Sequence, residues 1–348
     1  MAEAKNVLLL APSYMNIYKD VVEGLEKKGF DVTWIRDSQI PGNPHIYSIP
    51  KRKRKSLENY NTQVKKLWIE ILNSEECNKK FDYFLAIDGL MADETMFQIL
   101  NERNPSIKKV LFVYDPIEGD YQIDFLFKYY DRVFSFDFGD CKRYNLSFLP
   151  IFWVPARQES DIIYDIFGLA HLSYYKPQTI NAFQNVKNYA KSKGLSEKIQ
   201  LYRRIENKYK NIFWVIMSKL RGKKYYSNKE LKENDLFTTQ ALSPEEFRKT
   251  IQQSRTVLDV QAPNQDGLTA RFMWALGLGK KIMTFNKNVS RYPFYSSNQI
   301  LILNNSNYDD ILKFIKTEAP VSEDKRTAID KYRIDNWLDI LLGFSTNE

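Results

Sequence analysis

The sequence predicts an α/β protein in two halves, each an open parallel sheet with helices on both faces. Three observations predict this class. Short apolar runs of strand length alternate with segments whose apolar residues recur every three or four positions. A second series of the same kind begins near residue 160. The 348 residues exceed what one compact core usually holds and suit two domains of about 150 residues each.

The first half opens with a strand–helix–strand unit. Asn6–Ala11 is an apolar run that Pro12 ends, residues 16–28 show helical spacing up to Gly29, and Asp31–Ile35 is the next strand. A unit of about 30 residues implies parallel strands joined by a right-handed crossover. The further elements expected in this half are a helix Ser56–Leu72, a strand Tyr83–Ile87, a helix Ala92–Asn101 and strands Lys109–Tyr114 and Arg132–Phe136.

The second half follows a junction near residues 151–160. Ser243 begins a capping box, with Pro244 at the first helical position. The expected strands are Asp161–Phe167, Asn211–Met217, Thr256–Val260, Lys281–Thr284 and Gln299–Leu303. The expected helices are Lys176–Lys193, Ser243–Gln253, Thr269–Leu278 and an amphipathic closing segment, Lys325–Leu342.

Composition narrows the class of protein. With 43% hydrophobic and 27% charged residues, the chain is globular rather than disordered. Without a long apolar run or a secretory signal, we expect a cytoplasmic protein. Because the chain has only two cysteines and two histidines, we expect neither a disulfide framework nor a zinc site, and so no metal site. The net charge of +8 suits nucleic acid, anionic lipid or phosphorylated substrates, and composition does not choose among them.

Several common motifs are missing from the sequence. There is no P-loop and no GxGxxG after the first strand, which argues against the usual nucleotide fingerprints. Neither HExxH nor GxSxG occurs. The sequence also contains no Asp-x-Asp pair, which argues against a sugar transfer that uses a metal held by that motif.

The stretch 254–286 carries the most chemical information. A strand leads into the polar loop Gln261–Gly267 and then into a helix that starts near Thr269. Gly267 lets a ligand approach the backbone closely, and the free N–H groups of the helix start favour an anion. Arg271, in the first turn, can add a charge-assisted bond to a phosphate. The pattern predicts a cradle for a nucleotide diphosphate.

This stretch resembles the donor-binding element of GT-B glycosyltransferases, commonly written E-G-x₁₁-G-K. Asp266-Gly267 corresponds to the Glu-Gly, and Gly279-Lys280 corresponds to the closing Gly-Lys. The sequence motif Gly267-Leu268-Thr269, with Arg271 two residues later, resembles even more closely that of capsular and lipopolysaccharide biosynthesis transferases and of the CgeB-like group. Three further segments match that group in the same order, namely Tyr114-Asp115-Pro116, the segment 135–144 and Gly168-Leu169-Ala170-His171.

The resemblance implies two Rossmann-like domains with a cleft between them. The domains expected from it are an acceptor-binding domain 1–155, a donor-binding domain 156–322 and a helical segment 323–348 that crosses back to the first domain. It implies a metal-independent glycosyltransferase without a cofactor, which moves a sugar from a nucleotide-sugar donor to a cell-surface glycan or lipid-linked acceptor. The alternative, from another class, is a non-catalytic two-lobed protein that binds a sugar or a nucleotide.

Candidate catalytic residues are aspartates at the ends of strands, where ligands of open parallel sheets bind. Asp115 is the first candidate for a base near the acceptor hydroxyl. Asp88 and Asp137 are weaker candidates, since Asp88 can simply shape a turn and Asp137 can simply cap a helix. The residues expected to bind the donor are Gly168, His171, Gln265, Asp266, Gly267, Leu268, Thr269 and Arg271. Trp274 is expected to pack in the core rather than to stack on a base.

The strongest run of charge is Lys51, Arg52, Lys53, Arg54 and Lys55. A nucleic-acid patch is one interpretation, but no aromatic interleaving or known binding module accompanies the run, so we expect no nucleic-acid partner. A solvated loop is another interpretation. The preferred one is contact with anionic membrane lipid or a phosphorylated lipid-linked acceptor, which would make the protein peripheral at the inner face of the membrane.

Overall fold

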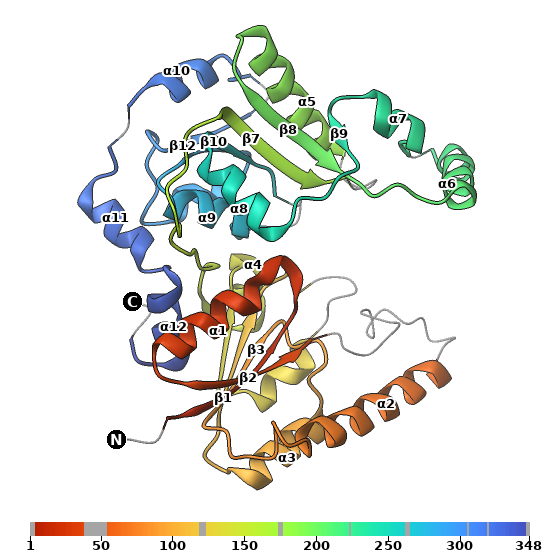
Figure 1. Ribbon diagram of the computed structural model, residues 1–348, viewed down its shortest axis with the longest axis vertical. Helices are drawn as coiled ribbons and strands as arrows, with labels where there is room; N and C mark the ends of the chain where they lie inside the picture. The colour runs from red at the N-terminus through yellow and green to blue at the C-terminus, as the bar shows by residue number, and fades with distance from the viewer. Residues whose placement is uncertain are drawn as a thin grey trace. The chain divides into compact units, whose positions relative to one another are not determined.

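The computed structural model describes residues 4–37, 54–117, 123–172, 177–222, 224–261, 265–304, 306–318 and 320–345. The chain divides into two compact units, Met1–Phe152 with Tyr332–Glu348, and Trp153–Lys331. Each unit contains a six-stranded parallel sheet with helices around it (Figure 1). The predicted α/β class with two Rossmann-like halves is confirmed.

The first unit is built on a sheet with strand order β2-β1-β3-β4-β5-β6. Leu9 of β1 lies beside Trp34 of β2 on one side and Leu85 of β3 on the other, in parallel register. Residues 7–11 and 83–87 are all buried, as expected for strands covered on both faces. The strands are β1 (Asn6–Ala11), β2 (Asp31–Arg36), β3 (Tyr83–Ile87), β4 (Lys108–Val113), β5 (Arg132–Ser135) and β6 (Ser147–Phe148).

Helices cover both faces of this sheet. On one face, Trp68 of α2 and Phe97 of α3 join a buried cluster with the strands. On the other, Trp337 of α12 packs edge-on against Phe112, with ring centroids 4.9 Å apart. A Cβ on Gly24 of α1 would lie 2.7 Å from Leu338 Cδ1, so glycine there permits the close approach of α1 and α12. The helices are η1 (Tyr14–Asn16), α1 (Ile17–Lys27), α2 (Arg54–Leu72), α3 (Glu94–Arg103), η4 (Asp124–Tyr129), α4 (Phe138–Tyr144) and α12 (Ile334–Leu342).

The second unit has a sheet with strand order β12-β11-β10-β7-β8-β9. Phe183 of α5 and Phe314 of α10 pack with one face, and Phe247 of α8 packs on Phe167 at the other. The strands are β7 (Tyr164–His171), β8 (Glu197–Tyr202), β9 (Phe237–Thr238), β10 (Ser254–Asp259), β11 (Lys281–Thr284) and β12 (Ile300–Ile302). The helices are α5 (Pro177–Ser192), α6 (Lys208–Leu220), α7 (Asn228–Glu233), α8 (Pro244–Gln252), α9 (Ala270–Gly277), η5 (Lys287–Arg291), α10 (Asp310–Lys316) and α11 (Glu323–Asp330).

Three sequence predictions about the second half are wrong. The expected strand at 211–217 is part of helix α6, which Asn207 caps by accepting a hydrogen bond from the N–H of Lys210. The expected strand at 161–167 begins later, at Tyr164, and runs to His171. The closing segment is two helices rather than one, and the part that joins the first unit begins at Tyr332 rather than at residue 323.

Two tryptophan hydrogen bonds lie on either side of the point where the closing segment passes from the second unit to the first. The indole Nε1 of Trp153 donates to the carbonyl of Ile329, 3.0 Å away, and so holds α11 in the second unit. In the first unit, Nε1 of Trp337 donates to the carbonyl of Pro150 at 2.9 Å. Within the described ranges, no helix combines the length and apolarity needed to cross a lipid bilayer.

Candidate active site

Asp88 follows β3 at the carboxyl edge of the first sheet. It has a left-handed backbone with φ of 65° and is buried. Its Oδ1 accepts a hydrogen bond from the N–H of Tyr114 at 2.8 Å, which ties the segment after β3 to the segment after β4. The carboxylate at this predicted position therefore accepts a hydrogen bond from a backbone N–H group and joins two loops.

Asp137 follows β5 and begins helix α4. Its Oδ1 accepts hydrogen bonds from the N–H groups of Gly139 at 2.8 Å and Asp140 at 3.2 Å, and only 3% of the residue is exposed. This is the geometry of a helix N-cap, the alternative considered for this residue. Asp115 differs from both, since it is exposed, two residues beyond the end of β4.

Two buried carboxylates at the same edge escaped the sequence analysis. Asp37, next after β2 and 1% exposed, accepts hydrogen bonds from the N–H groups of Leu90 at 2.8 Å and Met91 at 2.9 Å. Asp140 accepts one from the N–H of Ile117 at 2.8 Å. The strand-end rule that selected Asp88 would have selected Asp37 as well. Together these aspartates brace the segments that follow β3 and β4.

At the second sheet, a buried ion pair forms where β10 ends. Asp259, 1% exposed, accepts hydrogen bonds from Nε of Arg271 at 2.9 Å and from Oγ1 of Thr269 at 2.7 Å. Nη2 of Arg271 lies 2.8 Å from the same carboxylate oxygen, and Nη1 donates to the carbonyl of Leu169 in β7. Arg271 and Thr269 are thus brought together by Asp259, a residue that the sequence did not mark, and their predicted role in binding the donor stays a prediction.

The turn before α9 is fixed by two asparagines that follow β11. The side-chain amide of Asn286 donates to the carbonyls of Asp266 and Gly267, each at 3.2 Å. The amide of Asn288 donates to Oδ1 of Asp266 at 3.0 Å, and Gln265 donates to the carbonyl of Gly267 at 3.3 Å. Gly267 and Leu268 are buried, whereas Asp266 is exposed.

The first turn of α9 contains two amides for which the described part of the chain offers no acceptor. Thr269 is the N-cap, and its Oγ1 accepts from the N–H of Phe272 at 3.1 Å. Among the described residues, nothing accepts a hydrogen bond from the N–H of Ala270 or Arg271. Both residues are half-buried rather than sealed in the core. Unpaired N–H groups at a helix start form an anion-binding site.

Gly168 and His171 lie on β7, next to β10. A Cβ on Gly168 would lie 3.1 Å from Cβ of Leu258, so this glycine serves strand packing. His171 is exposed and is the last residue of β7, with its ring edge-on to Tyr202 at 5.9 Å. Because β7 and β10 are parallel neighbours, His171 lies at the same edge of the sheet as Asp259.

Other residues singled out by sequence lie apart from this edge. Nζ of Lys280 donates to the carbonyl of Gln252, and burial lowers the pKa of its ammonium group. Trp274 is buried under Phe247 and the guanidinium of Arg248, which is a core position as predicted. The basic run at 51–55 falls outside the residues whose side chains the structure describes. Among the described residues, no group of three or more His, Cys, Asp or Glu side chains is placed to hold a metal ion.

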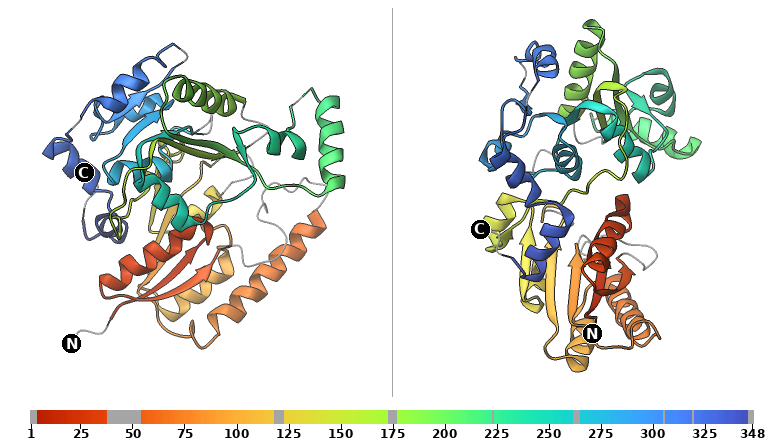
Figure 2. Two further views of the ribbon diagram at one scale, coloured as in Figure 1. Left: turned by 45° about the horizontal axis from the view of Figure 1, so that its top comes forward. Right: turned by 60° about the vertical axis from the view of Figure 1, so that its left-hand side comes forward.

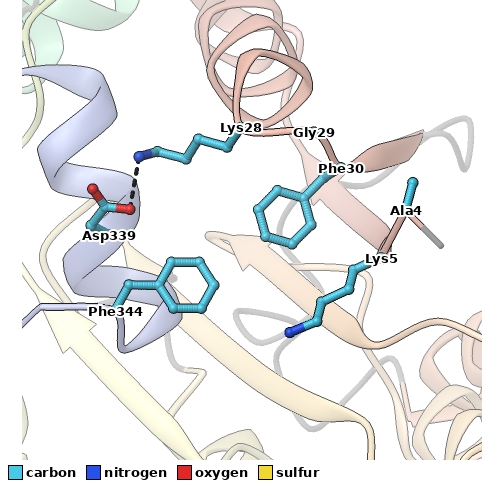
Figure 3. Close-up of a pocket in the computed structure, with 7 residues that line it drawn as sticks. All are labelled: Ala4, Lys5, Lys28, Gly29, Phe30, Asp339 and Phe344. Atoms are coloured by element: carbon cyan, nitrogen blue, oxygen red, sulfur yellow. Dashed lines mark hydrogen bonds and ion pairs between the residues drawn. The ribbon is translucent and has the colours of Figure 1, made fainter. Parts of the chain in front are cut away.

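A shallow pocket of about 550 Å³ lies at the opposite end of the first sheet (Figure 3). The rings of Phe30 and Phe344 stack across it at 6.2 Å, and Lys28 pairs with Asp339 at 2.7 Å. Phe30 precedes β2 and Lys5 precedes β1, so the pocket is at the amino ends of the strands. Ligands of open parallel sheets bind at the carboxyl ends, which leaves this pocket outside the candidate site.

Solved structures share the fold of the whole chain. The α,α-trehalose-phosphate synthase (UDP-forming) from Burkholderia vietnamiensis has a TM-score of 0.57 at 9% identity, covering 98% of this chain and 96% of that one. Sucrose-phosphate synthase from Thermosynechococcus elongatus has a TM-score of 0.53 at 9% identity, covering 98% and 97%. The N-terminal domain of Candida albicans trehalose-6-phosphate phosphatase reaches 0.56 at 9% identity, covering 99% and 98%. No protein-family model and no curated protein matches the sequence.

The architecture is that of GT-B glycosyltransferases, in line with the fold class predicted from the sequence. Because the sequence identity to these proteins is only 9%, the similarity shows a shared fold alone, and one fold can serve several functions.

Proposed function

We propose that the protein is a glycosyltransferase that moves a sugar from a nucleotide-sugar donor to an acceptor. The proposal depends chiefly on the N–H groups of Ala270 and Arg271, for which no described residue is an acceptor. They begin a helix at the carboxyl edge of the second sheet, where phosphate oxygens are favoured. Such groups would stabilise the diphosphate as it leaves the sugar. The fold supports this, since one protein that shares it is named as UDP-forming.

The acceptor in this proposal is a cell-surface glycan or a lipid-linked precursor of the capsule or lipopolysaccharide type. This choice of acceptor rests on the sequence motif Gly267-Leu268-Thr269 with Arg271, which resembles the motif of transferases in those pathways. The reaction is proposed to need no metal. The backbone amides that begin α9 would supply the stabilisation that a metal gives elsewhere, while Arg271, paired with Asp259, would hold the start of this helix in place.

Asp115 is the base that we propose for an inverting transfer. Its carboxylate would take the proton of the acceptor hydroxyl while that oxygen bonds to the anomeric carbon and the bond to the diphosphate breaks. Its exposure supports this role, whereas Asp88 and Asp137 are buried and hold backbone. We expect Asp115→Asn to lower turnover by about 100- to 10,000-fold without weakening donor binding. Unchanged turnover would remove Asp115 from the mechanism.

Ala270→Pro tests the amides directly. Proline has no N–H but suits the first position of a helix, and Thr269 before it already has the extended backbone that proline requires, with φ of −71° and ψ of 159°. The fold should therefore survive, while affinity for a nucleoside diphosphate falls by about 10- to 100-fold. Calorimetric titration with the preferred nucleotide measures the change.

Ala270→Ser is the matched control, because it keeps the N–H and changes the side chain alone. It should bind the nucleotide as the wild type does. Equal affinity in the proline and serine variants, with both folded, would mean that this amide does not contact the ligand.

The donor itself is found by thermal-shift measurements with UDP-, GDP-, CMP- and dTDP-sugars, since a true donor stabilises the fold by mass action. Release of the nucleotide in the presence of acceptor extract then measures transfer. The second candidate is a two-lobed binding protein without catalysis, favoured by the burial of Asp88 and Asp137, two of the three expected bases. A thermal shift without nucleotide release would support that candidate.

A further inference from the structure

Helix α6 (Lys208–Leu220) exposes an apolar face. None of its residues is buried. Five large side chains are exposed by 46–84%, and their spacing of three or four residues puts them on one side of a helix with 3.6 residues per turn. They are Tyr209, Ile212, Phe213, Ile216 and Leu220.

The opposite side of α6 faces its own unit. Oδ1 of Asn211 accepts a hydrogen bond from the N–H of Asn228 at 2.9 Å, at the start of α7. Trp214, Val215 and Ser218 are half-buried on this side. In Figures 1 and 2, α6 lies at the outer end of the second unit, well away from the strands of that unit. The apolar face is therefore left exposed within this unit, since the helix is anchored through its other side.

Cations lie on both flanks of the apolar face. At about 100° per residue, Lys208 and Lys219 fall on one flank and Lys210 and Arg221 on the other. All four are exposed, and residues 208–222 include no aspartate or glutamate. Lys210 has a distant partner, the half-buried Glu206, at 3.9 Å, and a pair at this distance with an exposed lysine neutralises little of its charge.

We propose that α6 is an interfacial helix that docks the second unit on an anionic lipid surface. The apolar face would enter the boundary between headgroups and acyl chains, and the flanking cations would contact phosphate groups. The aromatic side chains of Tyr209 and Phe213 are of a kind that favours the boundary between headgroups and acyl chains. A second copy of the chain fits less well, because a two-fold contact through this face would bring the same four cations against one another.

This proposal is independent of the sugar transfer proposed above and of the basic run at 51–55. It is tested without donor, by sedimentation of the full chain with vesicles. Vesicles of phosphatidylglycerol mixed with phosphatidylcholine should retain the protein, while pure phosphatidylcholine vesicles should retain far less. Raised salt should weaken the binding, since screening acts on exposed charges.

Two double variants separate the apolar face from apolar exposure in general. Phe213→Ser with Ile216→Ser should weaken vesicle binding at least about tenfold, since two large apolar groups no longer leave water. Phe125→Ser with Ile163→Ser is the matched control, because these residues are 48% and 51% exposed and lie outside α6. Lys208→Gln with Lys219→Gln should cost about fivefold for each cation.

Two results of the vesicle experiment would contradict the proposal. No retention of the wild type by anionic vesicles, or equal retention of the two double serine variants, would overturn the proposal. Light scattering adds a further check. If the Phe213 and Ile216 variant alone loses an oligomer while vesicle binding is unchanged, the face is a contact between copies of the chain and the proposal fails.

Discussion

The carboxyl edges of the two sheets are built from different chemistry. At the first edge, buried aspartates accept hydrogen bonds from backbone N–H groups, as Asp37 does from Leu90 and Met91. At the second edge, the buried aspartate Asp259 is neutralised by Arg271, and no described residue accepts a hydrogen bond from two backbone amides at the start of α9. The first edge concentrates negative charge, while the second offers positive dipoles.

This difference separates two roles that a strand-end aspartate can have. An aspartate that holds two loops together is structural even though it lies where ligands bind. An anion site needs donors that remain available, and at the second edge no described residue accepts a hydrogen bond from the N–H groups of Ala270 and Arg271. The comparison therefore predicts different consequences for removing an aspartate from either edge.

The largest effect is expected from Asp259→Ala at the second edge. The change leaves the guanidinium of Arg271, only 11% exposed, without its carboxylate and frees the Thr269 cap. We expect the free energy of unfolding to fall by about 3–5 kcal/mol, measured by urea denaturation. Nucleotide affinity should fall too, because the start of α9 loses its anchor.

Two controls sharpen this prediction. Asp235→Ala removes a carboxylate that is 61% exposed and pairs with Lys191, and should cost less than about 1 kcal/mol. Adding Arg271→Met to Asp259→Ala removes the unpaired cation and should recover part of the stability but not the nucleotide affinity. Full recovery of both would show that the ion pair does not position the ligand site.

A smaller effect is expected from Asp37→Ala at the first edge. The N–H groups of Leu90 and Met91 lose their acceptor, which should lower the free energy of unfolding by about 2–3 kcal/mol. Nucleotide affinity should not change, which is the contrast with Asp259→Ala. Asp31→Ala at the start of the same strand is the control, since that carboxylate is exposed and pairs with Lys79.

Much of the fold could be predicted because buried parallel strands are continuous apolar runs. Tyr83–Ile87 is such a run and is a strand with the same bounds in the structure. The same rule failed at Asn211–Met217, where apolar residues gather on the exposed face of a helix instead of a sheet. Strand β8 was missed for the opposite reason, since Glu197–Tyr202 mixes charged and apolar residues and is only partly buried.

The candidate site was predicted only as far as local sequence determines it. Gly267 and Thr269 belong to one turn and one helix start, where Thr269 caps the N–H of Phe272, so their spacing carried the information, whereas Arg271 bonds to Asp259 and to Leu169 of another strand. Asp259, Asn286 and Asn288 act across strands, and their hydrogen bonds depend on the register of β10 and β11. No motif in the chain marks contacts of that kind before the sheet is known.

Asp137 offers a subtler test of the first edge. Asp137→Ala should cost about 1 kcal/mol by removing the α4 cap. Asp137→Asn should keep both the cap and the stability, because asparagine caps helices as well as aspartate does. If the asparagine variant is as stable as the wild type yet loses turnover, Asp137 is catalytic and the contrast between the two edges is broken.

The smallest effect concerns Cys141, which reports the negative charge of the first edge. Burial raises the pKa of its thiol to about 12, and the carboxylates of Asp137 and Asp140 add to the shift. At neutral pH the group is therefore almost entirely thiol, and since only the thiolate reacts, iodoacetamide should modify it slowly. In a Cys77→Ser background, Asp137→Asn removes one of the two charges and should lower this pKa by a few tenths of a unit, which speeds modification about two- to threefold. Mass spectrometry follows the reaction over time, with Asp131→Asn as a control at the other end of β5. Equal rates in the Cys77→Ser protein and in both variants would mean that the carboxylates of this edge are well screened, and the electrostatic contrast between the two edges would then be lost.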